Sequence, residues 1–554
     1  MAAAAFNTAV ELFQGGRLAE AEALCRRQLL AQPPLASADL AGFLHILGLV
    51  AQGRGQTAIA VELMTEAARR APDDAALHSN LGVALSALGK GAEAEVAYRR
   101  SIALSPAHVE AHNNLGNLLR ARGDWTGAEA AYRTALGLRP TFADAHTNLG
   151  AVLNHRGDGA GAEAAYRRAL ALKPGNPDAL YNLGNLQAGR GDLPAAVDSY
   201  RQALAAAPKM VGAHNNLGTA LKALGDIDAA IASYRQALVL SPRYADAAYN
   251  LGLAWLTVGD YANGWPAHEA RWATVDFRPH HRVLPQPLWQ GQDLAGGTLL
   301  LHAEQGLGDT LQFCRYVPLV AARGIRVVLE VPGPLLRLLQ ASPALTTGGP
   351  VEIVAFGAPL PPFDAHCPLM SLPLALGTRV ETIPAQVPYL HAPGPLGGSV
   401  ADGTGARKVG LVWRGNPAYR TDRRRSLSAD QMAALVADCP AVEFHSLQKD
   451  AEFLPAGVID RMGGVDDFAD TATLVQSLDL VISVDTSVAH LAGALGRPVW
   501  LLNRFDTDWR WLRDRDDSPW YPTLRQFRQT ALDDWDDVIT RVRAALTEWG
   551  ANQA

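Results

Sequence analysis

A 34-residue repeat constrains this chain more than any other feature of its sequence. The tripeptide Asn-Leu-Gly recurs six times at that interval, and a second glycine follows nine residues after each asparagine. The six asparagines are Asn80, Asn114, Asn148, Asn182, Asn216 and Asn250. One unit of this length cannot bury its own apolar face, so the units must stack side by side. The first half of the chain is therefore predicted to be a repeat array.

Each unit carries the signals of a helix pair, as the one that begins near Asn80 illustrates. Gly82 would let the first helix pack closely on its neighbour, and Gly89 would make the turn between the helices. Pro106 would end the second helix, because proline cannot continue it. The pattern resembles the tetratricopeptide repeat. Two weaker units before the six, and an altered final stretch, YANGWPAHEARW, predict about eight units over residues 1–275, the last docked on the following domain.

The asparagine column has two interpretations, and the sequence leaves both open. Identical spacing would align the six side chains along one groove, where amides could bind the backbone of an extended peptide. Alternatively, asparagine at this position of the first helix makes only local hydrogen bonds. In either case the array predicts a protein-binding surface.

The second half changes to alternating strands and helices. TLLLHA, IRVVLEV and VEIVAF read as buried strands, and KVGLVW, VEFHSL, LVISV and PVWLL form a second series. The flexible composition of residues 394–406 separates the two series. We therefore expect an N-terminal lobe with its connector at 276–393, a linker at 394–406 and a C-terminal lobe at 407–554. A ligand would bind between the lobes, at the carboxyl ends of the strands.

The loop HAEQGLGDTLQF, residues 302–313, follows the first of these strands. Gly306 and Gly308 would leave space for a ligand, and Asp309 lies at the expected start of a helix. An aspartate there is commonly an N-cap, but in a cleft it could also act as a general base. Glu304 is a second carboxylate in the same loop.

A second loop, at the end of LVISV, has the features of a phosphate site. Asp485 follows the strand, and Thr486 and Ser487 open a helix whose free N–H groups attract anions. His490 would share a helix face with Thr486. Arginines gather after the strand KVGLVW, and guanidinium groups suit phosphate oxygens. Arg425, with Ser426, is the expected ligand-facing pair, whereas Arg423 and Arg424 suit a solvated loop.

Together these loops resemble the two signature loops of glycosyltransferase family nine, the heptosyltransferase family. The segments PLMSLP (368–373) and DSPWYPTLRQFRQ (517–529) resemble the bacterial branch in which such a domain follows tetratricopeptide repeats, a branch that includes flagellin glycosyltransferases. The layout is also similar to that of O-GlcNAc transferase. The resemblance implies an all-α superhelix followed by an α/β, two-lobed GT-B-like domain.

The family's roles can be carried over residue by residue. Asp309 matches the base that deprotonates the acceptor hydroxyl, with inversion at the sugar. Arg425 falls near a position where the family often has a lysine. The expected nucleotide-sugar-binding residues are Gly306, Gly308, Arg425, Ser426, Asp485, Thr486, Ser487 and His490. The resemblance implies a protein O-glycosyltransferase acting on Ser or Thr of a protein bound by the array, with flagellin as one candidate acceptor.

Composition limits the other function classes. The net charge of −6 argues against general nucleic-acid binding, and no apolar run approaches the length of a membrane span. Four scattered cysteines fit a reduced, cytoplasmic protein without a metal site. Asp506 and Asp508 imitate a metal-binding DxD motif, but GT-B enzymes usually stabilise the leaving phosphate without a metal. The alternatives are a non-catalytic scaffold and an enzyme with a lipid-linked acceptor.

Overall fold

The computed structural model describes residues 2–30, 35–304, 306–394, 406–417 and 422–551. It contains two compact units, residues 1–213 and 214–554. The expected array at 1–275 is thus divided between them, with its last two helix pairs in the second unit. Most of the expected linker at 394–406 lies outside the described residues.

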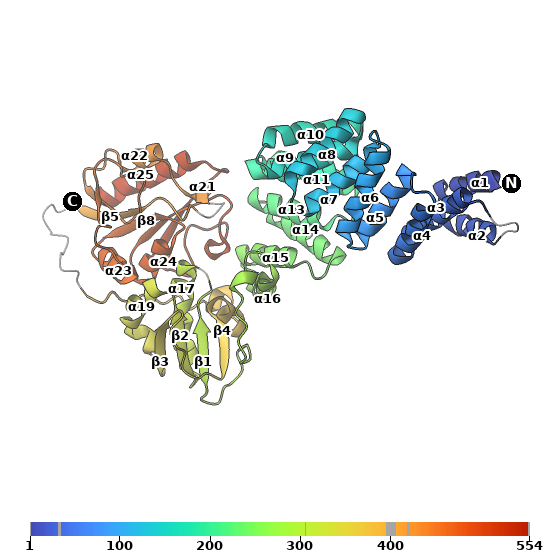
Figure 1. The fold of residues 1–554 in the computed structure, drawn as a ribbon. Coiled ribbons are helices and arrows are strands. Elements are labelled where there is room, and N and C mark those ends of the chain that lie inside the picture. The colour runs from blue at the N-terminus through green and yellow to red at the C-terminus, as the bar shows by residue number, and fades with distance from the viewer. Residues whose placement is uncertain (1, 31–34, 305, 395–405, 418–421, 552–554) are drawn as a thin grey trace. The chain divides into compact units, whose positions relative to one another are not determined.

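The first unit consists of antiparallel helix pairs (Figure 1). Its helices are α1 (Ala2–Gln14), α2 (Leu18–Leu29), α3 (Ser37–Gly53), α4 (Thr57–Arg70), α5 (Ala75–Ala87), α6 (Gly91–Leu104), α7 (Val109–Ala121), α8 (Trp125–Leu138), α9 (Ala143–His155), α10 (Gly159–Leu172), α11 (Pro177–Arg190) and α12 (Leu193–Ala206). Helix α13 (Val211–Ala223) spans the division, and α14 (Ile227–Leu240), α15 (Ala245–Thr257) and α16 (Tyr261–His268) follow.

The repeated glycines and tyrosines explain how each pair packs. A Cβ built on Gly116 of α7 would lie 2.6 Å from Cε1 of Tyr132 on α8, and the tyrosine ring is fully buried. The same contact recurs in neighbouring units, including Gly150 with Tyr166. Gly123 makes the turn with φ +81°, a conformation that side chains disfavour. The 34-residue period is therefore a packing period, as predicted.

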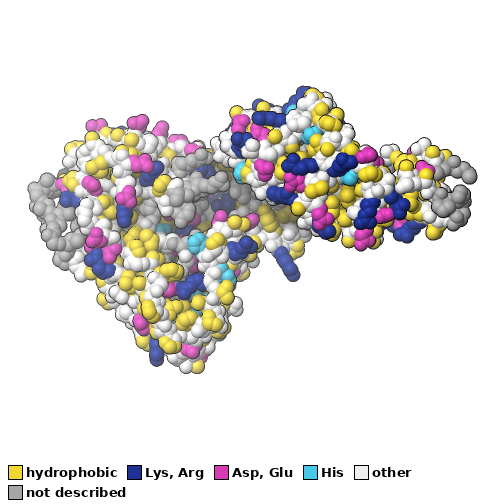
Figure 2. Space-filling view, viewed as in Figure 1, with side chains coloured by type: hydrophobic (Ala, Val, Ile, Leu, Met, Phe, Trp, Pro, Cys, Tyr) yellow, Lys and Arg dark blue, Asp and Glu magenta, His cyan; other side chains and the backbone are white. Residues whose placement is uncertain are grey.

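Acidic and basic side chains are interspersed over the visible face of the array in Figure 2. Several of them pair within and between repeats: Glu163 contacts Arg167 at 2.6 Å and Arg190 at 2.5 Å. Such exposed pairs contribute little to stability, but they leave no large region of one charge sign on this face.

The second unit holds two parallel sheets. The first has the order β3-β2-β1-β4 and the second the order β10-β9-β8-β5-β6-β7. The first lobe comprises β1 (Thr298–His302), α17 (Leu307–Phe313), α18 (Val317–Ala321), β2 (Arg326–Val331), α19 (Gly333–Gln340), β3 (Val351–Ala355), β4 (Ala365–Pro368) and α20 (Leu372–Ala375). The second comprises β5 (Arg407–Val412), α21 (Asp422–Arg425), α22 (Ala429–Val436), β6 (Val442–Ser446), β7 (Val458–Asp460), α23 (Phe468–Gln476), β8 (Leu480–Val484), α24 (Ser487–Ala494), β9 (Val499–Asn503), β10 (Leu524–Arg528) and α25 (Trp535–Ala551).

Helices cover both faces of the larger sheet. Along β8 the side chains alternate: Ile482 and Val484 belong to the cluster that includes α22 and α25, whereas Val481 packs with α23 and α24. Burial on both faces is why these strands read as continuous apolar runs. Each sheet directs the carboxyl ends of its strands towards the loops described below.

The last repeats pack directly on the α/β part of this unit. Trp265 of α16 donates its indole N–H to the carbonyl of Thr378 at 3.1 Å, and its ring lies 5.2 Å from that of Trp509. The altered eighth repeat is thus a docking element, in agreement with the prediction. This packing explains why the compact units divide within the array and not at its end.

Candidate functional site

The Gly-rich loop after β1 positions PLACEHOLDER Gly306 is the N-cap of α17, and Asp309 is the third residue of the helix. The capping interpretation of Asp309 is therefore wrong. A Cβ on Gly306 would lie 2.7 Å from Oδ2 of Asp309, so only glycine allows the carboxylate to fold back over the turn. Glu304, by contrast, points away into the protein and is 1% exposed.

The second loop begins at the carboxyl end of β8. Thr486 is the N-cap of α24, but its hydroxyl contacts Ser483 Oγ at 3.0 Å and does not cap the helix. The first N–H groups of α24 thus lack a side-chain cap, which is the arrangement that favours an anion. Helices α17 and α24 pack against each other: a Cβ on Gly308 would lie 2.9 Å from Cδ2 of His490.

The two loops share one cavity of about 870 Å³ between the lobes. Of the residues expected from the sequence, it is lined by Gly306, Gly308, Asp309, Arg425, Asp485, Thr486, Ser487 and His490. Ser426 does not line it; its hydroxyl donates to Asp422 Oδ2 at 2.9 Å. The structure therefore brings together all but one of the expected donor-site residues.

Arg425 and Arg424 have different surroundings. Arg425 donates from Nη1 to the carbonyl of Asp485 at 2.9 Å and from Nε to Asp422 at 2.8 Å, which fixes it at the cavity wall. Arg424 is 22% exposed and pairs with Asp506 at 3.0 Å. Arg424 is therefore a structural residue, not the solvated side chain that the sequence predicts. The side chain of Arg423 lies outside the described residues.

His490 is buried and oriented by its neighbours. Its Nδ1 lies 2.9 Å from the hydroxyl of Tyr521, and its ring stacks on Trp511 at 5.2 Å. Burial lowers the pKa of His490 to about 3, and the nearby Arg510 adds to this effect. The imidazole is thus neutral at neutral pH, and it presents its Nε2 edge towards Gly308.

A residue from a distant loop completes the site. Arg510, in the short 3-10 helix Trp509–Trp511, forms an ion pair with Asp309 and contacts Asp508 at 2.9 Å. The sequence indicated Arg510 as a nucleotide-pocket residue or part of a loop beside it, but not as a partner of Asp309. Asp506 and Asp508 pair with different arginines, Arg424 and Arg510, and do not form a joint carboxylate pair.

Burial dominates the electrostatics of the carboxylates in the cavity. It raises the pKa of Asp309, and Arg510 opposes that effect. Burial also raises the pKa of Asp485, with a further contribution from Asp508. A carboxylate with a raised pKa is suited to accept a proton near neutral pH.

The asparagine column makes hydrogen bonds between repeats. Asn148 donates to Asn113 Oδ1 at 3.1 Å, and Asn250 donates to Asn215 Oδ1 at 3.1 Å. Asn80 lies 2.9 Å from the imidazole of His45. These bonds support the local interpretation at three positions. The column is half-buried throughout, at Asn80, Asn114, Asn148, Asn182, Asn216 and Asn250, and peptide binding by it stays a prediction.

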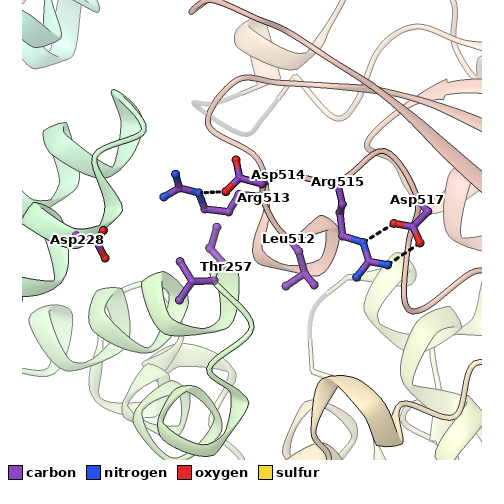
Figure 3. Close-up of a pocket in the computed structure, with 8 residues that line it drawn as sticks. Asp228, Thr257, Leu512, Arg513, Asp514, Arg515 and Asp517 are labelled. Carbon is purple, nitrogen blue, oxygen red and sulfur yellow. Dashed lines mark hydrogen bonds and ion pairs between the residues drawn. The ribbon is translucent and has the colours of Figure 1, made fainter.

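A second hollow, of about 590 Å³, lies between α15 and the loop 512–517 (Figure 3). Its arginines are occupied by neighbouring carboxylates: Arg513 contacts Asp514 at 2.8 Å, and Arg515 forms two hydrogen bonds to Asp517. It combines no helix N-terminus with an available arginine fork. The cavity between the lobes is thus the better candidate for an anionic ligand.

Comparison with known proteins identifies the array. The tetratricopeptide repeat family matches residues 47–109, 113–177 and 157–211, and a second family described as TPR repeat matches residues 218–259. The N-terminal half of the chain is a tetratricopeptide-repeat array. Arrays of this kind mediate protein–protein interaction, so a protein partner is expected. Within the described residues, no helix is long and apolar enough to cross a membrane.

A curated relative extends beyond the matched repeats. The chain is 27% identical over 322 residues to protein FlbA of Caulobacter vibrioides, which corresponds to 52% of this chain and 53% of that protein. The chain therefore spans about half the length of the curated relative it matches. Similar solved structures include Cut9 with Hcn1 (22% identity, TM-score 0.39, 48% of this chain and 52% of that chain). YrrB, described as a TPR protein with an unusual peptide-binding site, is 21% identical (TM-score 0.28, 34% and 96%).

Proposed function

We propose that the chain is a protein O-glycosyltransferase of the GT-B type, which moves a sugar from a nucleotide-sugar to a Ser or Thr of a protein bound by the array. The observation that carries the proposal is that Asp309 and the N-terminus of α24 line one cavity between two parallel-sheet lobes. A carboxylate base and an anion site within one cavity are the two elements that sugar transfer from a diphosphate needs.

The residues can be assigned to the steps of the reaction. The acceptor hydroxyl oxygen bonds to the anomeric carbon while the bond from that carbon to the diphosphate oxygen breaks. The hydroxyl proton passes to Asp309, and the nucleoside diphosphate leaves with the bonding electron pair. Its negative charge would be stabilised by the free N–H groups of α24 and by Arg425.

His490 has a supporting role in this proposal. Because it is neutral at neutral pH, its Nε2 can make a neutral hydrogen bond to the sugar or to a phosphate oxygen. The contact between Gly308 and His490 sets the width of the cavity at the point where the two lobes meet. No described residue group forms a metal-binding cluster of His, Cys, Asp and Glu, so the proposal assigns no step to a metal.

The test is binding followed by transfer. Isothermal titration calorimetry with UDP, GDP, ADP and CDP should detect at least one ligand. The protein is then incubated with the corresponding nucleotide-sugars and candidate acceptor proteins, and intact mass shows whether a sugar was added. Binding of no nucleoside diphosphate would reject the proposal and favour a scaffold built on the array.

A further inference from the structure

Asp309, the base of the proposed reaction, is held by a guanidinium group. Every nitrogen of Arg510 has a partner: Nη2 pairs with Asp309, Nη1 donates to Asp508 at 2.9 Å, and Nε donates to Gln312 at 2.8 Å. Arg510 is only 11% exposed and Gln312 is fully buried. The fork is thus held in one orientation, with one arm on the base.

A carboxylate that accepts a charge-assisted hydrogen bond is a weaker base than a free one. In this arrangement Asp309 would have to exchange a strong interaction with Arg510 for the proton of an acceptor hydroxyl. The proposed reaction therefore needs a way to separate Asp309 from Arg510 at the moment of transfer.

The cavity contains the means of separation. Arg510 lines the same space as Thr486 and Arg425, where the proposed function places the diphosphate. A diphosphate carries more negative charge than one carboxylate, and its oxygens fit the planar guanidinium fork. A bound donor would thus compete with Asp309 for Arg510.

Other charged groups around Asp309 oppose its ionisation or are neutral. Burial raises the pKa of Asp309, and the negative charge of Asp508 acts in the same direction, so Arg510 is the group that offsets both. The titratable groups that face this turn from the surrounding elements are Asp508 and Arg510 beside the 3-10 helix, Glu304 on the loop after β1, Tyr249 on α15, and Asp485 and His490 beside α24.

We propose that Arg510 is a positioning residue that restrains Asp309 until the phosphates of a bound donor draw the guanidinium away, so that the base is released only in the donor-bound state. This inference rests on the proposed function. It makes the reaction ordered, with the donor binding before the acceptor can react. It also makes donor binding take up a proton, because Asp309 without its cation holds a proton more tightly.

The experiment measures that proton. Binding of the nucleoside diphosphate with the highest affinity is titrated by calorimetry at pH 6.5 in buffers with different ionisation enthalpies, and the slope gives the protons taken up. The intact protein should take up roughly half a proton or more, as expected when one pKa moves through the working pH. Asp309→Asn should abolish this uptake while nucleotide still binds.

Two further variants separate the restraint from a merely structural role. Arg510→Gln should also lose most of the uptake, because Asp309 is then unrestrained before the nucleotide binds. Arg513→Gln, which removes an exposed arginine that pairs only with the adjacent Asp514 in the described contacts, should keep it. If Arg510→Gln does not fold, as judged by circular dichroism, Asp309→Asn decides alone.

The outcomes separate the inference from the function it rests on. Nucleotide binding with the same proton uptake in the Asp309→Asn variant, or with none in the intact protein, would overturn the restraint and leave the proposed function standing. If no nucleoside diphosphate binds at all, the proposed function fails, and the restraint fails with it.

Discussion

Replacing Arg271 with methionine should destabilise the second unit strongly. Arg271 lies in the short 3-10 helix Glu269–Ala273, just after the array, and is 0% exposed. Its Nε and Nη2 donate to the two oxygens of Glu304 at 2.9 Å each, and Glu304 is 1% exposed. Removing one partner of a buried pair leaves an uncompensated charge, which costs about 3–5 kcal/mol.

The cost should depend on pH with a defined sign. Burial raises the pKa of Glu304 in the folded protein, and Arg271 opposes that shift. Without Arg271 the folded protein binds a proton at Glu304 more tightly than the unfolded chain does. Stability therefore falls as pH rises from the unfolded value, about 4.3, through the higher folded value. The Arg271→Met variant should thus be nearest to the intact protein at pH 5 and furthest from it at pH 8.

The assay is urea unfolding of the full chain, followed by tryptophan fluorescence at both pH values. The second unit contains nearly all the tryptophans, including Trp289, Trp413 and Trp511, so this signal reports on it. Arg513→Met is the matched control, since its exposed ion pair should contribute no more than about 1 kcal/mol. Adding Glu304→Gln to Arg271→Met should recover part of the loss. A loss below about 1 kcal/mol at pH 8, or one that does not change with pH, would refute the buried-pair reasoning.

Two further predictions test close contacts of glycine. Gly116→Ala should destabilise the array by about 1–3 kcal/mol, because its Cβ would lie 2.6 Å from the buried Tyr132 ring, whereas Gly137→Ala, with no atom within 4 Å, should stabilise it slightly; urea midpoints compare the two, and equal effects would contradict the packing argument. Gly308→Ala should weaken nucleoside diphosphate binding at least about tenfold without unfolding the protein, since its Cβ would lie 2.9 Å from His490, and unchanged affinity in calorimetry would show that this contact does not shape the cavity.

The array was predictable because one local rule repeats. Each unit needs a glycine opposite a tyrosine, a second glycine in a left-handed turn and a proline after the second helix, and all three leave a visible period in the sequence. Gly123 illustrates the rule: its φ of +81° identifies the turn without knowledge of any other residue. The seven strands read from apolar runs are also present, and within the described residues the pairings between their neighbours are parallel.

The strands that were missed have weaker signals. The strand β4, AHCP, is only four residues long and ends in proline, and β10, LRQFR, alternates charged and apolar residues. Each gains its partners from the sheet: β4 pairs with β1, and β10 pairs with β9. Sequence composition alone does not record that edge positions tolerate such residues.

The candidate site was predictable where it depends on strand ends, and not where it depends on distant pairing. Thr486 and Asp309 follow buried strands directly, so their positions follow from topology. The ion pair between Asp309 and Arg510 joins residues 201 positions apart, and no local pattern encodes it. The same holds for Arg271 with Glu304. Ser426 was expected at the cavity because it neighbours Arg425, but its hydroxyl turns to Asp422.

The most direct test of the proposed catalysis compares sugar transfer with nucleotide binding in the Asp309→Asn variant. Intact acceptor mass follows transfer over time, and calorimetry follows nucleoside diphosphate affinity in the same preparation. A general base contributes about 10²–10⁴-fold, so the variant should transfer sugar at least about 100-fold more slowly while it binds nucleotide nearly as well as the intact protein. Transfer at the intact rate would contradict the assignment of Asp309 as the base.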